Sequence, residues 1–115
     1  MSASRPGRGE VWLTDFDPTR GHEQAGIRPG VVVSVDTFNL GLSGLVVILP
    51  MTTTFRRNPL HVLVEPPEGG VRRRSFVMCE DIRSVARERL LERWGTLNPT
   101  TITLVEDRLR ILLRL

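Results

Sequence analysis

Glu23-Gln-Ala-Gly-Ile-Arg-Pro-Gly30 and, directly after it, Val31-Val-Val-Ser-Val35 form the most informative segment of the chain. The β-branched run favours a buried strand. Arg28 stands between a glycine turn and a proline, so we expect it at the rim of the sheet rather than inside the core. Its planar guanidinium can hold a phosphate or a carboxylate through two parallel hydrogen bonds. The segment therefore predicts a phosphate-handling site where the strand begins.

The length of the chain limits it to one domain. Its 115 residues suffice for one modest hydrophobic core and not for two. The first residues, Met1-Ser-Ala-Ser-Arg-Pro-Gly7, lack the apolar core of a signal peptide. We expect residues 1–7 to form a disordered tail and residues 8–115 to form a single domain.

Arginine supplies all the positive charge of this chain. There are 16 arginines and no lysine, and the net charge is +3. Arginine suits forked recognition of phosphates and stacking on bases. A GC-rich genome would enrich arginine as well, so composition leaves both causes open and the positions of the arginines must decide.

Several classes of protein are disfavoured by what the sequence lacks. Cys79 is the only cysteine, which excludes an internal disulfide framework and a cysteine-based metal site and suggests a reducing cytoplasm. Apolar runs stay well short of the roughly 18 residues that a membrane span needs. We therefore expect a cytoplasmic protein without a membrane segment, a resident metal or a cofactor. A magnesium site made only of carboxylates stays open as an alternative.

Short strand-like runs separated by glycine and proline turns recur through residues 10–79. Residues 19–27 between the first two runs lack periodicity and predict a long functional loop. This pattern is typical of a small, mostly antiparallel β-barrel. The predicted strands are residues 10–16, 31–35, 45–49, 61–64 and 76–79.

The C-terminal 18 residues carry the pattern of an amphipathic helix. Asn98-Pro99 suits an N-cap followed by proline at the first helical position, and apolar residues recur at helical spacing up to Leu112. Arg108, Arg110 and Arg114 complement the helix dipole near its C-terminal end and need no ligand to explain them. A shorter helix is expected over residues 87–93, with Leu90 and Leu91 facing inward.

Two further segments, one rich in threonine and one in arginine, are candidates to act together with Arg28. Thr52, Thr53 and Thr54 follow a buried strand and Pro50, and they precede Arg56 and Arg57. Hydroxyl donors beside cations can stabilise a developing oxyanion, although an ordinary threonine-rich turn satisfying its own backbone explains the same pattern. Arg72-Arg-Arg74 is either a compact cationic turn that contacts nucleic-acid phosphates or a solvated loop.

Other titratable residues give weaker signals. His22 and His61 are the only histidines and show no metal-ligand spacing. His61 lies in a predicted strand and fits a structural role, whereas for His22 a structural and a catalytic role both stay open. Glu80 and Asp81 lie on alternate faces of a predicted strand end, which favours a fold role or the orientation of an arginine over acid–base work.

Four motifs give the chain a family resemblance. In order and spacing, Gly9-Glu-Val-Trp12, Glu23-Gln-Ala-Gly-Ile-Arg-Pro29, Pro50-Met-Thr52 and Glu80-Asp-Ile-Arg-Ser84 resemble the MazF/PemK toxin endoribonucleases, also called mRNA interferases, from about Arg8 to Leu115. The resemblance implies a mainly β fold with a C-terminal helix, built as an SH3-like antiparallel barrel. It also implies a homodimer, metal-independent cleavage of single-stranded RNA at short motifs, and inhibition by a cognate MazE-like antitoxin with an acidic tail.

The resemblance also assigns roles to individual residues. Arg28 matches the family's catalytic arginine and Thr52 its catalytic threonine. Two positions depart from the family pattern: Asp81 stands where glutamine is usual, and Gly30 replaces a larger aliphatic residue, so substrate contacts and loop rigidity are expected to differ. Candidate RNA-binding residues are Glu23, Gln24, Thr53, Arg56, Arg57, Arg72, Arg73 and Glu80.

This assignment needs no metal, because RNA supplies its own nucleophile. We expect the 2′-hydroxyl to attack the adjacent phosphorus, giving a 2′,3′-cyclic phosphate and a 5′-hydroxyl end. A guanidinium is protonated at neutral pH and has no free site to accept a proton, so Arg28 is expected to stabilise charge and to serve as an acid rather than a base. Phe55, Trp12 or an arginine plane is expected to stack on unpaired bases.

Two other functions are compatible with the same scaffold. A CcdB-like protein would poison DNA gyrase by protein contact without chemistry, and a non-catalytic module would only bind RNA. The arginine and threonine motifs favour the ribonuclease, and the C-terminal Leu113-Arg-Leu115 offers no aromatic anchor for a protein hot spot. Replacing Arg28 by alanine separates the enzyme from the binding module. In an enzyme the variant should lose cleavage and keep its fold, whereas in a binding module binding and activity should weaken together.

Overall fold

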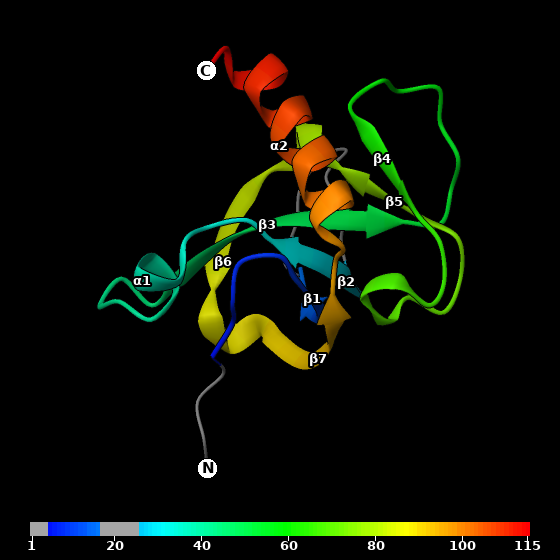
Figure 1. The fold of residues 1–115 in the computed structure, drawn as a ribbon. Helices are drawn as coiled ribbons and strands as arrows, with labels where there is room; N and C mark the ends of the chain where they lie inside the picture. Colours follow the sequence, from blue (N-terminus) through cyan, green and yellow to red (C-terminus); the bar gives the residue numbers. More distant parts are fainter. Residues whose placement is uncertain (1–4, 17–25) are drawn as a thin grey trace.

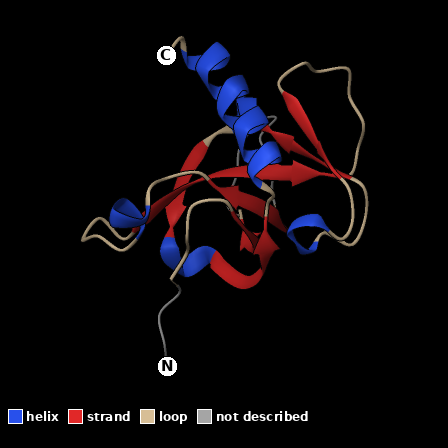
Figure 2. Ribbon diagram, in the orientation of Figure 1, coloured by secondary structure: helices blue, strands red, loops and turns tan. Residues whose placement is uncertain are grey.

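The computed structural model describes residues 5–16 and 26–115 and is dominated by strands (Figures 1 and 2). A 15-residue helix follows the last strand, and short helical turns connect several of the others. The strands are β1 (Glu10–Asp15), β2 (Ile27–Val32), β3 (Leu45–Thr52), β4 (His61–Val64), β5 (Ser75–Met78), β6 (Arg83–Ala86) and β7 (Leu90–Thr96). The helical elements are α1 (Asp36–Asn39), η1 (Glu68–Gly70), η2 (Cys79–Asp81), η3 (Arg87–Arg89) and α2 (Pro99–Leu113).

All strand pairs are antiparallel, in the order β4-β5-β3-β2-β1-β7, with β6 also paired to β3. The long strand β3 is the centre of the sheet. One edge of β3 pairs first with β6 and then, near its end, with β5, while its other edge pairs with β2. The predicted mainly β architecture with a C-terminal helix is confirmed.

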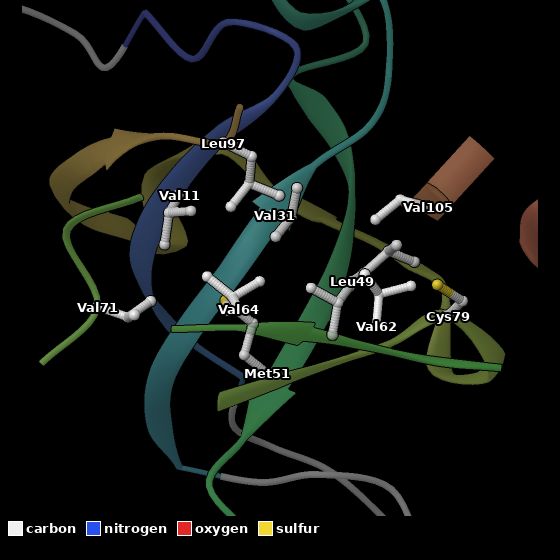
Figure 3. Packing of buried hydrophobic residues seen from close by; sticks show 11 residues of the cluster. Val11, Val31, Leu49, Met51, Val62, Val64, Val71, Cys79, Leu97 and Val105 are labelled. Atoms are coloured by element: carbon white, nitrogen blue, oxygen red, sulfur yellow. The ribbon is translucent and has the colours of Figure 1, made fainter. Parts of the chain in front are cut away.

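Both faces of the sheet are covered by apolar side chains. Figure 3 shows the larger cluster, which includes Val11, Val31 and Leu49. Their sequence neighbours Trp12 and Val32 belong to a second cluster with Phe16 and Ile48. Because side chains alternate along a strand, adjacent residues enter opposite faces. This explains why β2 and β3 are apolar without interruption at their centres.

Helix α2 lies across one side of the sheet, and its C-terminal end projects beyond it (Figure 1). Val105 and Thr101 are buried, whereas the last residues of the helix are exposed. The predicted N-cap, Asn98, precedes Pro99, but its side chain makes no capping hydrogen bond. Arg108 donates to the carbonyl of Pro59 at 2.9 Å, so this arginine serves the fold. No helix in the described part of the chain is long and apolar enough to cross a membrane.

The predicted helix over residues 87–93 is wrong. Only η3 is helical there, and the chain continues as β7, which pairs with β1 through two irregularities in register. Leu90 is buried as expected, whereas Leu91 is 51% exposed and does not face inward. The irregular register explains why no clear two-residue period marks this strand in the sequence.

Two predicted boundaries also change. Strand β2 runs from Ile27 to Val32 rather than over residues 31–35, so Arg28 lies inside a strand. Part of the predicted disordered tail is ordered, because Pro6 is buried and its carbonyl accepts a hydrogen bond from the buried Asn39 side chain at 3.2 Å. Residues 1–4 lie outside the described residues, as do residues 17–25, which include residues 19–25 of the predicted loop.

Candidate active site

A hollow of about 280 Å³ opens where β2 begins and β3 ends. It brings together the arginine and the threonine that the sequence singles out. Its wall combines one cation, four hydroxyl side chains and two apolar residues. The lining residues are Arg28, Pro29, Met51, Thr52, Thr53, Thr54 and Ser75.

The register of β2 on β3 explains why Arg28 and Thr52 converge. Gly30 lies opposite Pro50 and Val32 lies opposite Ile48 in the antiparallel ladder. Continuing this register by two residues places Arg28 level with Thr52, and the two-residue period of a strand returns both to the face of Gly30 and Pro50. Two residues 24 positions apart in the sequence therefore line one hollow.

Two prolines coincide with the end of that ladder. Pro29 and Pro50 carry no backbone N–H, so neither can donate a ladder hydrogen bond. The recorded pairing of β2 with β3 stops at Gly30 and Pro50, and the hollow lies beyond that point. The prolines thus help to keep the strand ends apart where Arg28 and Thr52 project.

Gly30 is explained by packing on the face of the sheet that it shares with Arg28 and Val32. A Cβ atom at this position would lie 2.8 Å from Cδ1 of Ile48 and 3.0 Å from Cζ of Phe16. The volume that a larger aliphatic residue would occupy is therefore filled by these two side chains. The departure of Gly30 from the family pattern is compensated within the core.

Thr52 is held with its hydroxyl group oriented by the local backbone. The residue is buried, and its Oγ1 accepts a hydrogen bond from the Thr54 N–H at 3.1 Å. The threonine-rich turn thus does satisfy its own backbone, as one reading of the sequence expected. A hydroxyl that accepts in this way still has its proton to donate. Thr53 and Thr54 are exposed at the mouth of the hollow.

Ser75 also lines the hollow, although no sequence pattern predicted it as a site residue. It begins β5, is buried, and donates its hydroxyl to the Arg73 carbonyl at 2.8 Å. Its position follows from the pairing of β5 with β3, in which Phe76 lies opposite Thr52. No local motif around residue 75 signals this placement, because the pairing joins segments more than 20 residues apart.

The other predicted RNA-binding residues are dispersed. Arg56 and Arg57 are exposed just after the threonines, and Arg73 is exposed just before β5. Arg72 lies over the ring of Trp94, 4.6 Å from its centroid and away from the lining of the hollow. Glu23, Gln24 and His22 fall outside the described residues.

Glu80 and Asp81 serve the fold in the way that the sequence analysis favoured. Glu80 Oε2 lies 2.9 Å from Nε2 of His61, whose side chain is almost fully buried, and this contact joins η2 to β4. Asp81 accepts a hydrogen bond from Arg83 at 2.7 Å. This contact supports the structural role predicted for His61, while Nδ1 of the ring is buried without a hydrogen-bond partner. A contact of Glu80 with RNA would have to compete with this histidine.

The described residues contain no cluster of three or more histidine, cysteine, aspartate or glutamate side chains that could hold a metal ion. Cys79 is buried in the larger core cluster. Burial, and secondarily the Glu80 carboxylate, raise the pKa of its thiol to about 12, although Arg108 opposes the shift. Cys79 is therefore a core residue rather than a nucleophile.

A second hollow, of about 660 Å³, lies beside Trp94. Glycines of η1 and β7 line it together with two acidic residues, Glu65 and Glu68. The other lining residues are Pro67, Gly69, Gly70, Trp94, Gly95, Thr96 and Asn98. By contrast, no acidic residue of the described chain lines the hollow at Arg28.

The chemistry available at Arg28 is electrostatic. A guanidinium and fixed hydroxyl donors surround a space large enough for a phosphate group, and the strands hold them in place before any ligand arrives. Such a site can bind an anion and stabilise charge that develops on its oxygens. A transferring phosphoryl group meets this description.

Comparison with known proteins agrees with that chemistry. Residues 7–113 match the family described as PemK-like, MazF-like toxins of type II toxin-antitoxin systems. The endoribonuclease MazF9 of Mycobacterium tuberculosis is 34% identical over 109 residues, which cover 90% of this chain and 92% of that protein. The crystal structure of MazF from Deinococcus radiodurans superposes with a TM-score of 0.87 at 29% identity, covering 97% of this chain and 99% of that one. A chain of the MazE-MazF crystal structure from the same organism gives a TM-score of 0.78 at 30% identity, with coverages of 97% and 98%.

Proposed function

Because this chain belongs to the PemK-like, MazF-like toxins of type II toxin-antitoxin systems, we propose that it cleaves single-stranded RNA at short sequence motifs without a metal ion. The observation that carries the proposal is the convergence of Arg28 and Thr52 on one hollow free of carboxylates among the described residues. Messenger RNA is the proposed physiological substrate.

The proposed reaction is an internal phosphoryl transfer. The 2′-hydroxyl oxygen attacks the adjacent phosphorus and loses its proton to solvent, while the bond from phosphorus to the 5′ oxygen breaks. The departing 5′ oxygen takes up a proton, for which Arg28 is the candidate donor, and Arg28 then regains a proton from solvent. The products are a 2′,3′-cyclic phosphate and a 5′-hydroxyl end, so no oxidant, metal or external nucleophile is consumed.

In this reaction the protein positions the phosphate and stabilises charge. Arg28 holds the phosphoryl oxygens with its forked donors, and Thr52 donates its hydroxyl proton to one of them. Ser75, at the wall of the hollow, limits the position of the phosphate. The strands fix these groups in advance, which is the condition for electrostatic catalysis.

The RNA backbone continues from the hollow over exposed cations. Arg56, Arg57 and Arg73 flank it in the chain, and Thr53 lies at its mouth. Arg72 and Glu80 are candidates for more distant contacts, which would have to displace their present partners, Trp94 and His61. Glu23 and Gln24 complete the proposed RNA-binding set.

The proposed partners follow from the family. A relative has been solved as a MazE-MazF complex, and we propose that this chain is likewise neutralised by a cognate antitoxin with an acidic tail. Such a tail would mimic RNA by presenting carboxylates to the same arginines. We further propose that the chain acts as a homodimer in the cytoplasm, where messenger RNA is found.

Purified protein incubated with a long single-stranded RNA in EDTA tests the reaction directly. Primer extension maps the cut sites, and end labelling with polynucleotide kinase distinguishes a 5′-hydroxyl from a 5′-phosphate. We expect discrete cuts with 5′-hydroxyl and cyclic-phosphate ends. The Arg28→Ala variant, checked by circular dichroism for a retained fold, should leave the RNA intact.

Three outcomes contradict the proposal in different ways. Intact RNA with folded, antitoxin-free wild type across varied sequences would remove the ribonuclease and favour a gyrase poison of the CcdB kind. Equal cleavage by Arg28→Ala would show that the hollow is not the active site. Cleavage that stops in EDTA would show that the reaction needs a metal ion and would contradict the metal-free mechanism.

A further inference from the structure

We propose that Phe55 is the platform on which the base next to the cleaved phosphate stacks. This inference rests on the proposed ribonuclease function and extends it to a residue that reads the substrate. Phe55 follows Thr54 directly, and Thr54 lines the hollow that contains Arg28 and Thr52. A base attached to a nucleotide held there would have this ring as the next aromatic surface after the end of β3.

The phenyl ring of Phe55 is available to a ligand. It is 66% exposed, whereas most of the large apolar side chains of β2 and β3 are buried. An exposed aromatic ring can gain binding free energy when a base covers it.

The ring is also held in a defined position. Its centroid lies 5.7 Å from that of Phe76, with the two ring planes inclined at 58°. Phe76 is buried and stands opposite Thr52 in the ladder between β3 and β5. Phe55 is thus anchored to the residue that faces the proposed catalytic threonine. An anchored platform loses less conformational freedom on binding than a free side chain.

A cation accompanies the aromatic pair. The guanidinium carbon of Arg74 lies 5.7 Å from the centroid of the Phe76 ring, and the Arg74 side chain is exposed. An arginine beside an aromatic platform can contact the phosphate of the stacked nucleotide or its base. Stacking combined with a nearby cation is the usual arrangement for binding single-stranded nucleic acid.

The remaining aromatic residues do not offer such a surface. Trp12 and Phe16 are buried. Trp94 lies beside the second hollow and has Arg72 over its ring. Phe38 is on α1 and contributes nothing to the hollow at Arg28. Since the chain has only six aromatic residues and all lie in described segments, Phe55 is the one that combines exposure with proximity to Thr54.

Stacking makes a specific prediction about substrates. Every base has a π-face, so Phe55 contributes affinity to all sequences and favours the larger rings of purines. The contact is made by ground state and transition state alike, so its loss should raise KM and leave kcat nearly unchanged. Arg28 and Thr52, which act on the phosphate, should show the opposite pattern.

The test compares Phe55→Leu, which keeps an apolar side chain, with Phe55→Trp, which keeps a stacking surface. The probe is a short RNA that wild type cuts, made uncleavable by a single 2′-deoxy sugar at the cut site and carrying 2-aminopurine on one side of it or the other. We expect wild type to quench the fluorophore at one of the two positions. Phe55→Leu should bind about tenfold more weakly and lose that quenching, and Phe55→Trp should restore both.

A matched control and the contrary outcomes complete the design. Leu42→Ala removes a fully exposed apolar side chain from the turn between α1 and β3 and should bind like wild type. Equal binding and quenching by wild type and Phe55→Leu would overturn the inference, and so would a loss of antitoxin binding with RNA binding unchanged. If wild type cuts no RNA, the proposed function fails first, whatever the Phe55 variants do.

Discussion

Two hollows lined by described residues differ in the charge of their walls more than in their origin. Both form where strand ends meet a turn, and the one beside Trp94 is the larger, at about 660 Å³ against about 280 Å³. The smaller hollow is lined by Arg28 and hydroxyl groups, whereas the larger one includes the carboxylates of Glu65 and Glu68. A phosphate would be attracted to the first and repelled by the second.

The polar groups around the larger hollow are also occupied by the fold. Glu68 accepts the Asn98 N–H at 2.9 Å, just before α2. Trp94 donates its indole N–H to Glu92 at 2.8 Å, and Arg72 lies over its ring. Size therefore does not identify the site of phosphate chemistry. An arginine beside threonine hydroxyls does, in a wall to which no described acidic residue contributes.

If the comparison holds, a change in the larger hollow should affect stability and leave chemistry alone. Gly70 has a φ of +74°, and a Cβ atom there would lie 2.2 Å from the carbonyl oxygen of Trp94. Gly70→Ala should therefore lower the free energy of unfolding by about 3 kcal/mol, as measured by urea denaturation. The kcat of the molecules that remain folded should equal that of wild type.

Gly44→Ala is the matched control for that variant. Gly44 has a similar φ of +71°, but nothing lies within 4 Å of the added Cβ. Gly44→Ala should lower the free energy of unfolding only by the cost of backbone strain, about 1 kcal/mol. A Gly70→Ala protein as stable as Gly44→Ala, or one that is stable and inactive, would contradict the structural role given to the larger hollow.

A change in the smaller hollow should have the reverse signature. Thr52→Val removes the hydroxyl and keeps the shape, so kcat should fall about 100-fold. The Thr54 N–H loses its acceptor, which should cost about 1 kcal/mol of stability. Single-turnover cleavage of a short RNA measures the first effect and urea denaturation the second. Thr52→Ser restores the hydroxyl and should recover most of the activity, and failure to do so would argue against a hydroxyl donor.

The salt dependence of RNA binding distinguishes a phosphate contact near the smaller hollow from one near the larger hollow. Arg57 is exposed after the threonines of the smaller hollow, whereas Arg72 lies beside the larger one. Arg57→Ala should weaken binding several-fold at low salt and reduce the slope of log K against log salt by about 0.7, the value for one phosphate contact on a single strand. Arg72→Ala should reduce the slope equally only if bound RNA extends to Trp94. Fluorescence anisotropy across a salt series distinguishes the two paths.

Local sequence patterns predicted the elements whose signals are local. The alternation that begins at Glu10, the run from His61 to Val64 and the Asn98-Pro99 helix start correspond to β1, β4 and α2. These segments each carry their own turn or capping chemistry. Strand β7 was predicted as a helix because its register on β1 is irregular, and that irregularity depends on the partner strand.

The candidate site was predictable in part for the same reason. Arg28 and Thr52 were identifiable from motif chemistry and resemblance, and their meeting depends on the β2–β3 register. Ser75 and the support of Phe55 by Phe76 depend on the pairing of β5 with β3, for which nothing in the sequence around residue 75 gives a sign. Contacts of Arg72 with Trp94 are likewise non-local. Long-range pairing is what sequence periodicity leaves out.

The smallest expected effect is the loss of folding stability at acidic pH that Glu10 causes, on a strand beside the larger hollow. Glu10 on β1 lies opposite Thr96, which lines that hollow. Burial alone would raise the pKa of Glu10, but hydrogen bonds from the Gly7 N–H and the Trp12 indole, and the hydrogen bond and charge of Arg93, lower it below its ordinary value of 4.5. The folded state therefore holds the carboxylate more favourably than the unfolded chain does.

The sign of this linkage fixes the experiment. Because the folded pKa of Glu10 is depressed, its stabilising contribution is fully present above the ordinary value and is lost as pH falls through the folded value. Glu10→Gln should thus be less stable than wild type at pH 7, and the difference in free energy of unfolding should narrow at an acidic pH below the ordinary value of 4.5. Glu88→Gln, at an exposed glutamate in η3, should match wild type at both values. A gap for Glu10→Gln that is the same at both pH values would mean that its packing, rather than its charge, stabilises this side of the molecule.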